Sequence, residues 1–120
     1  MNIQSLLWVS IALFAITAAG GLIMAGIRMF ADRNPPAWLA MMHGLLAGAG
    51  LTLLLFAAFT VGLPKYALWA LIMLVIAALG GVFLNLGYHE KDKPLPKPVM
   101  YVHALIAAAG FILLIFAAIG

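Results

Sequence analysis

The sequence predicts an all-α integral membrane protein, an up-down-up-down four-helix bundle built from two tandem two-helix repeats. Three observations lead to this fold class. Of the 120 residues, 68% are hydrophobic and 8% are charged, with a mean hydropathy of +1.23. A soluble domain carries about 25% charged residues, so both a soluble fold and a disordered chain are excluded. Four long apolar runs alternate with short polar segments, and the second half of the chain repeats the pattern of the first.

The four apolar runs are the expected membrane spans of a single domain covering residues 1–120. None contains Asp, Glu, Lys or Arg, and we place them at about residues 3–27, 38–61, 66–88 and 99–119. A hydrocarbon core about 30 Å thick takes about 20 helical residues to cross, and each run is long enough. Each run should be helical because the bilayer offers no water to backbone groups. Barrel strands would alternate apolar and polar residues, which these runs do not.

Loop charges give the expected orientation. Short connections favour antiparallel neighbours, so both termini lie on one side together with Lys65. Loops 28–37 and 89–98 lie on the other side, and they hold the remaining five cations. The positive-inside rule makes these loops cytoplasmic and the termini external, which fits the bacterial inner membrane.

Residues 1–60 and 61–120 align as two repeats without a gap. The segment His43–Ala58 falls on His103–Ala118 with ten of 16 positions identical, and Gly20-Gly21 falls on Gly80-Gly81. Both copies begin on the same side of the membrane, so a two-fold axis along the membrane normal should relate them. This symmetry places the second and fourth spans diagonally opposite each other.

The matched histidines are the main candidate site. His43 and His103 each lie seven residues after a proline, roughly 10 Å into their spans at a rise of about 1.5 Å per residue. An ionisable residue at such depth is a functional-site hypothesis by default. Helices packed about 8–10 Å apart leave a diagonal gap of roughly 12–14 Å, which two imidazoles ligating one iron would fill.

Small residues accompany the histidines. Gly50 and Ala47 follow His43 on the same helical face, and Gly110 and Ala107 stand in the same relation to His103. They would leave room for a porphyrin beside its ligands. The glycines of the other two spans would line its flanks: Gly20, Gly21, Gly80 and Gly81. Close helix packing is the alternative explanation for all of these small residues.

Other roles for the histidines remain open. A membrane histidine can also form an interhelical hydrogen bond, relay protons, contact a quinone or bind another metal. Zinc would need about four ligands, and two histidines do not supply them. His89 has no repeat partner and is expected to be an interfacial loop residue, with a proton path or contact to a haem propionate as the functional alternative.

Several classes of function are excluded or unsupported. The chain has no cysteine, so disulfides, Fe–S clusters and thiol catalysis are ruled out. No carboxylate lies inside a span, unlike in proton-coupled exporters and pumps. Phosphate-binding, hydrolase, metalloprotease and dinucleotide motifs are absent. Six cations spread over membrane loops do not form a nucleic-acid groove, and the N-terminus lacks the features of a cleavable signal.

The repeated pattern H-[GA]-L-[LI]-A-x-A-G resembles the membrane b-type cytochromes, four-helix bundles with histidine-ligated haem. The resemblance implies one haem b per chain, with His43 and His103 as axial ligands, because two-haem members carry four ligating histidines. It implies electron transport with a quinone or a partner redox subunit, and leaves open whether the chain is part of a quinone-linked oxidoreductase. The alternative is a non-catalytic scaffold or accessory subunit of a larger complex, or a homodimer held by glycine-rich faces. A channel or carrier would need a polar pathway that the sequence lacks.

Overall fold

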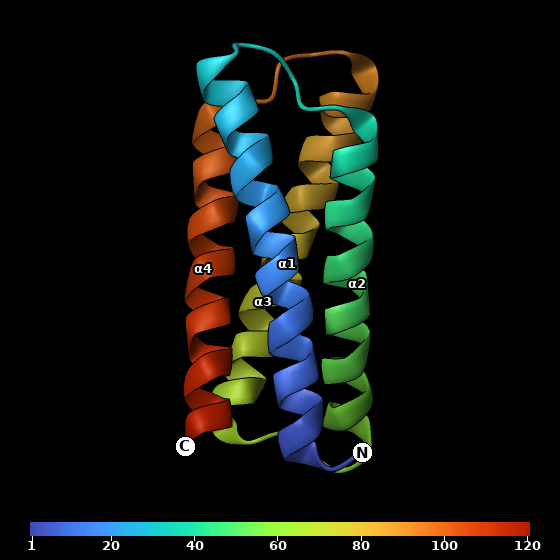
Figure 1. The fold of residues 1–120 in the computed structure, drawn as a ribbon, viewed down its shortest axis with the longest axis vertical. Coiled ribbons are helices and arrows are strands. Elements are labelled where there is room, and N and C mark those ends of the chain that lie inside the picture. Colours follow the sequence, from blue (N-terminus) through green and yellow to red (C-terminus); the bar gives the residue numbers. More distant parts are fainter.

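The computed structural model describes all 120 residues as an antiparallel four-helix bundle (Figure 1). Its elements are α1 (Ile3–Phe30), α2 (Ala37–Phe59), α3 (Lys65–Gly87), the short 3-10 helix η1 (His89–Lys91) and α4 (Lys97–Ile119). The bundle measures 43 × 19 × 19 Å. All four long helices are apolar and long enough to cross a membrane. The predicted all-α four-helix bundle is confirmed. Each expected span corresponds to one helix, although α2 ends two residues and α3 one residue before the expected end.

Local sequence signals explain where the helices begin. The side chain of Asn2 caps α1 by accepting a hydrogen bond from the Ser5 backbone N–H at 2.8 Å. The other three long helices each begin directly after a proline: Pro36, Pro64 and Pro96. A proline ring restricts φ to helix-compatible values and donates no backbone hydrogen bond, so it suits the entry to a helix, where that donor would be unpaired anyway.

The two polar loops contain a matched turn. Asp32 and Asp92 occupy equivalent positions in the two repeats, and both adopt the left-handed conformation, with φ of 51° and 55°. Aspartate visits this region more readily than most residues because its short side chain can hydrogen-bond locally. The same left-handed backbone conformation therefore occurs in the turn after α1 and in the turn after α3.

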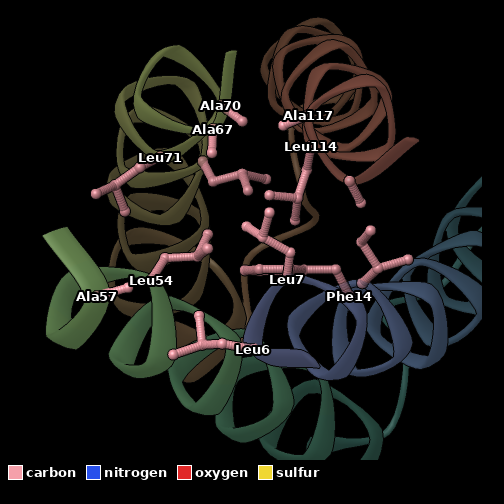
Figure 2. Close-up of a cluster of buried hydrophobic side chains, with 13 residues drawn as sticks. Leu6, Leu7, Phe14, Leu54, Ala57, Ala67, Ala70, Leu71, Leu114 and Ala117 are labelled. Carbon is pink, nitrogen blue, oxygen red and sulfur yellow. The ribbon is translucent and has the colours of Figure 1, made fainter. Parts of the chain in front are cut away.

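The half of the bundle that holds the termini is tightly packed. A cluster of 13 buried hydrophobic residues from all four helices fills it, with Leu7, Leu54 and Leu114 fully buried at the centre (Figure 2). Packing is closest within each hairpin, between α1 and α2 and between α3 and α4. The core is therefore concentrated away from the two polar loops, and the other half of the bundle has room for a cavity.

In each hairpin one glycine permits the close approach of the two helices. A Cβ atom added to Gly50 would lie 2.7 Å from the ring of Phe14, and one added to Gly110 would lie 3.0 Å from Leu74. Phe14 and Leu74 are themselves equivalent positions of the two repeats. Each hairpin thus closes by seating a large side chain from its first helix on a glycine of its second.

The two polar loops are joined by four hydrogen bonds, which we call the loop clasp. Arg28 Nε donates to the Leu95 carbonyl at 2.9 Å, and His89 Nε2 donates to the Pro35 carbonyl at 2.6 Å. Asn34 makes the other two, donating to the Lys93 carbonyl at 2.7 Å and accepting from the Leu95 N–H at 3.0 Å. The clasp ties the two hairpins together at the end of the bundle opposite the termini.

Candidate functional site

The structure brings the two repeated histidines together. His43 on α2 and His103 on α4 face each other across the bundle, with ring centroids 6.3 Å apart and ring planes at 67°. Both side chains are partly buried, in the half of the bundle that carries the polar loops. The sequence-based expectation that these two residues face the bundle axis is therefore met.

Each imidazole is held by one backbone hydrogen bond. His43 Nδ1 lies 2.9 Å from the Thr17 carbonyl oxygen on α1, and His103 Nδ1 lies 2.7 Å from the Ala77 carbonyl oxygen on α3. A carbonyl oxygen only accepts, so each Nδ1 must carry the proton. No protein group hydrogen-bonds to Nε2 of either ring, so in a neutral ring this nitrogen keeps a free lone pair. Both bonds are interhelical, the alternative role named for membrane histidines, and in a neutral ring they fix the tautomer that a metal ligand needs.

A glycine makes each of these hydrogen bonds possible. In an α-helix the carbonyl of residue i points toward the N–H of residue i+4, so the side chain at i+4 lies beside that carbonyl. The residues four positions after Thr17 and Ala77 are Gly21 and Gly81. A Cβ atom at Gly21 would lie 2.9 Å from His43 Cε1, and one at Gly81 would lie 3.2 Å from His103 Cε1. The two glycines leave the space that the imidazoles occupy.

The histidine pair lines a partly open cavity of about 1090 Å³ to which all four helices contribute. Its inner end is bounded by the rings of Phe14 and Phe111, and its outer end reaches the loop clasp at His89 and Leu95. The walls are mostly hydrophobic. The polar side chains that line the cavity are few: Thr17, His43, Asn85, His89, Glu90 and His103.

Of four further sequence-predicted small residues, three border the histidines or their cavity and Gly20 does not. Ala47 and Ala107 line the cavity. Gly80 does not line it, but an added Cβ there would lie 3.6 Å from His103 Nδ1, an ordinary contact. Gly20 has nothing within 4 Å of such an atom. The closest approach to each imidazole is therefore at the second glycine of each pair, Gly21 and Gly81.

Gly50 and Gly110 lie elsewhere. Neither lines the cavity, and the space beside each is filled by Phe14 and Leu74 respectively. Both glycines therefore lie where two helices pack closely, which was the alternative explanation for the small residues. Contact of either residue with a cofactor stays a prediction.

The structure adds site residues that sequence reasoning missed. The carbonyls of Thr17 and Ala77 hold the histidines, and backbone atoms leave no trace in a side-chain pattern. Their signal was indirect, in the small residue four positions later. Asn85 was also missed, although it is the one carboxamide in the apolar run 66–88.

The loop residues have definite partners. His89 lines the outer end of the cavity while its Nε2–H bonds to Pro35. Arg28 is largely buried, and its guanidinium bonds to the Leu95 carbonyl and forms an ion pair with Asp32 at 3.0 Å. Arg28 is therefore part of the clasp and does not line the cavity.

The two imidazoles would suit a metal whose remaining ligands come from a bound cofactor. A metal bonded to imidazole nitrogens at about 2.0–2.1 Å lies about 3.2 Å from each ring centroid, so two imidazoles on opposite sides of one metal have centroids about 6.4 Å apart. The observed centroid separation of 6.3 Å is close to this spacing and would suit such a metal if both Nε2 atoms point toward it. No group of three or more metal-ligating side chains exists in the chain. Two imidazoles without a third ligating side chain would suit the axial positions of a macrocycle-bound iron.

Comparison of the chain with protein-family models, with curated proteins and with solved structures finds no match.

Proposed function

We propose that this protein is an integral membrane electron-transfer protein that binds one b-type haem between α2 and α4. His43 and His103 would hold the haem, which would supply a centre for electron exchange with a quinone or a partner redox subunit. The observation that carries the proposal is the matched pair of hydrogen bonds from Nδ1 to the Thr17 and Ala77 carbonyls. Metal-ligating histidines almost always donate their second ring N–H in this way, which fixes the tautomer and raises the basicity of the ligand.

The proposal includes the architecture in the membrane. The four apolar helices cross the bilayer as two tandem hairpins, with the loop clasp on the cytoplasmic side and both termini outside. Support comes from the five cations gathered at the clasp end and from contacts that recur at equivalent positions of the two repeats, at the histidines, their carbonyl partners and their glycines. In this arrangement the proposed haem lies in the cytoplasmic half of the membrane.

The chain's own residues define what the site can do. Bound haem supplies a one-electron redox centre. His43 and His103 would hold the haem iron between them, and a haem with both of these ligands would serve electron transfer rather than oxygen activation. The apolar walls limit the access of water, and such a hydrophobic shell is one of the controls on redox potential. The backbone hydrogen bonds hold both rings in place in either redox state.

The decisive experiment is an absorption spectrum of protein purified from haem-replete cells. We expect a Soret band and the sharp visible bands of a low-spin six-coordinate haem on reduction, at a stoichiometry of one haem per chain. His43→Ala and His103→Ala should each lose this spectrum. His89→Ala is the matched control, because it also removes a cavity-lining histidine, and it should keep the spectrum. Colourless wild-type protein with co-purifying partners would replace this proposal with the scaffold or accessory-subunit alternative.

A further inference from the structure

The outer end of the cavity is polar on one side only. Asn85 on α3 and His89 and Glu90 on η1 all line it; Asn85 and His89 are partly buried, whereas Glu90 is exposed at the mouth. Asn85 Nδ2 donates a long hydrogen bond of 3.4 Å to Glu90 Oε1. The equivalent residues of the first repeat are apolar: Ala25, Met29 and Phe30. The polar end therefore breaks the two-fold symmetry that relates the histidines, because only the second repeat supplies its polar residues.

This polar end lies close to the histidine pair. Gly81, whose Cα faces the His103 ring, is four residues before Asn85, so the two share a face of α3 about 6 Å apart along the helix axis at about 1.5 Å per residue. His89 Nε2 is committed to the Pro35 carbonyl, which leaves its Nδ1 as an acceptor. Asn85 supplies amide donors and Glu90 supplies carboxylate acceptors. A ligand bound here would lie within one or two helical turns of the proposed haem.

The cavity is partly open toward the outer face of the bundle. Six side chains that line it are each more than half exposed: Met41 and Leu45 on α2, Val82 and Leu86 on α3, Leu22 on α1 and Ile112 on α4. In a membrane these side chains contact acyl chains. The occupant that can use this opening is a lipid-soluble molecule with a polar head group.

We propose that the polar end of the cavity binds the head group of a lipid-soluble hydroquinone, with Glu90 accepting a hydrogen bond from one hydroxyl and Asn85 donating to its oxygen. The choice of a redox-active ligand rests on the proposed haem function. The reduced form is favoured over the quinone because a quinone has only acceptors and would face the Glu90 carboxylate without a proton between them. The same carboxylate disfavours an anionic ligand at this end.

The test compares binding of a short-chain hydroquinone and of the corresponding quinone to the full chain in lipid nanodiscs. Hydroquinone binding is measured under argon on reduced protein, and quinone binding on oxidised protein, with radiolabelled ligand. The key variant is Glu90→Gln, which replaces two acceptors by one acceptor and a donor. The matched control is Asp92→Asn, which makes the same chemical change two residues away, on an exposed side chain that does not line the cavity.

We expect wild-type protein to bind the hydroquinone at least tenfold more tightly than the quinone. Because Glu90 is exposed and water competes for its carboxylate, Glu90→Gln should shift this ratio by about threefold to tenfold toward the quinone. Asn85→Ala should weaken both ligands, and Asp92→Asn should leave the ratio unchanged. Absence of saturable binding, or an unchanged ratio in Glu90→Gln, would overturn the proposal. The Soret band is recorded on the same samples, so a haem protein without the ligand site is distinguished from a ligand site without haem.

Discussion

Substitution of Gly21 by alanine tests how the proposed histidine ligands are positioned. A methyl group at this position would lie 2.9 Å from His43 Cε1. Carbon atoms in contact prefer about 3.5–4.0 Å, so the imidazole would have to move by roughly 0.6–1.1 Å. A shift of this size draws Nδ1 away from the Thr17 carbonyl, which it now meets at 2.9 Å. The perturbation therefore acts on the ligand ring through a residue that makes no hydrogen bond to it.

Two opposing effects set the magnitude. Loss of the Nδ1 hydrogen bond removes about 0.5–1.5 kcal/mol of stabilisation. Alanine in a helix interior is favoured over glycine by about 0.8–1.0 kcal/mol. The free energy of unfolding should consequently change by less than about 1 kcal/mol. Haem affinity should fall much more, by about 10–100-fold, because outer partners that orient a metal-bound histidine have effects of this size.

The structure offers a graded series of matched variants. The same methyl group would lie 3.2 Å from His103 Cε1 at Gly81 and 3.6 Å from His103 Nδ1 at Gly80, and would touch nothing at Gly20. Haem affinity, measured by titrating haem into apoprotein and following the Soret band, should therefore fall in the order Gly20→Ala, Gly80→Ala, Gly81→Ala, Gly21→Ala. Thermal unfolding of the same samples separates haem loss from unfolding. Equal haem affinity in Gly21→Ala and Gly20→Ala would refute the reasoning that the space at Gly21 positions the ligand.

Three further outcomes follow from the packing, the clasp and the orientation. Gly50→Ala should lower the melting temperature, because overpacking against Phe14 costs about 1–3 kcal/mol and the better helix propensity of alanine offsets only part of it. Gly48→Ala is the control, because the space beside Gly48 is open, and it should not lower the melting temperature. Equal melting temperatures of the two variants would contradict the close approach at Gly50. Asn34→Ala removes two hydrogen bonds between the loops and should reduce the free energy of unfolding by about 1–2 kcal/mol without shifting the absorption bands; a shifted spectrum would mean that the clasp also shapes the cavity. In this cysteine-free chain, a membrane-impermeant maleimide should label Lys65→Cys on intact cells and Lys93→Cys only after permeabilisation, and the reverse pattern would invert the proposed orientation.

The bundle could be predicted because the sequence signals for its helices are long and redundant. Four apolar runs without charge, separated by prolines and cations, leave few alternatives to four helices. The proximity of His43 and His103 was also predictable, because a repeat of fixed length carries one position onto the other and the symmetry of the bundle brings both to its axis. Regular features that recur are the ones a pattern can reveal.

The glycines show where the pattern stops. Gly20 and Gly21 are adjacent in sequence and equivalent in composition, but only the second faces the histidine, and helical phase at one-residue precision depends on how α1 packs against α2. Likewise, Gly50 shares a helical face with His43, yet Phe14 from the other helix fills the space beside it. These contacts are tertiary, so periodicity within one helix cannot distinguish a residue beside a cavity from one beneath a packed ring.

The departure from two-fold symmetry at Asn85 and Glu90 has a consequence for how such a site can arise. Two identical hairpins of half this length, associating as a dimer, could present the same pair of imidazoles, because each hairpin supplies one histidine, one carbonyl and one glycine. Every polar group added at the mouth would then appear twice, once on each side. A single covalent chain is free of that duplication, so the inner part of the site can keep its paired ligands while the mouth becomes different on its two sides.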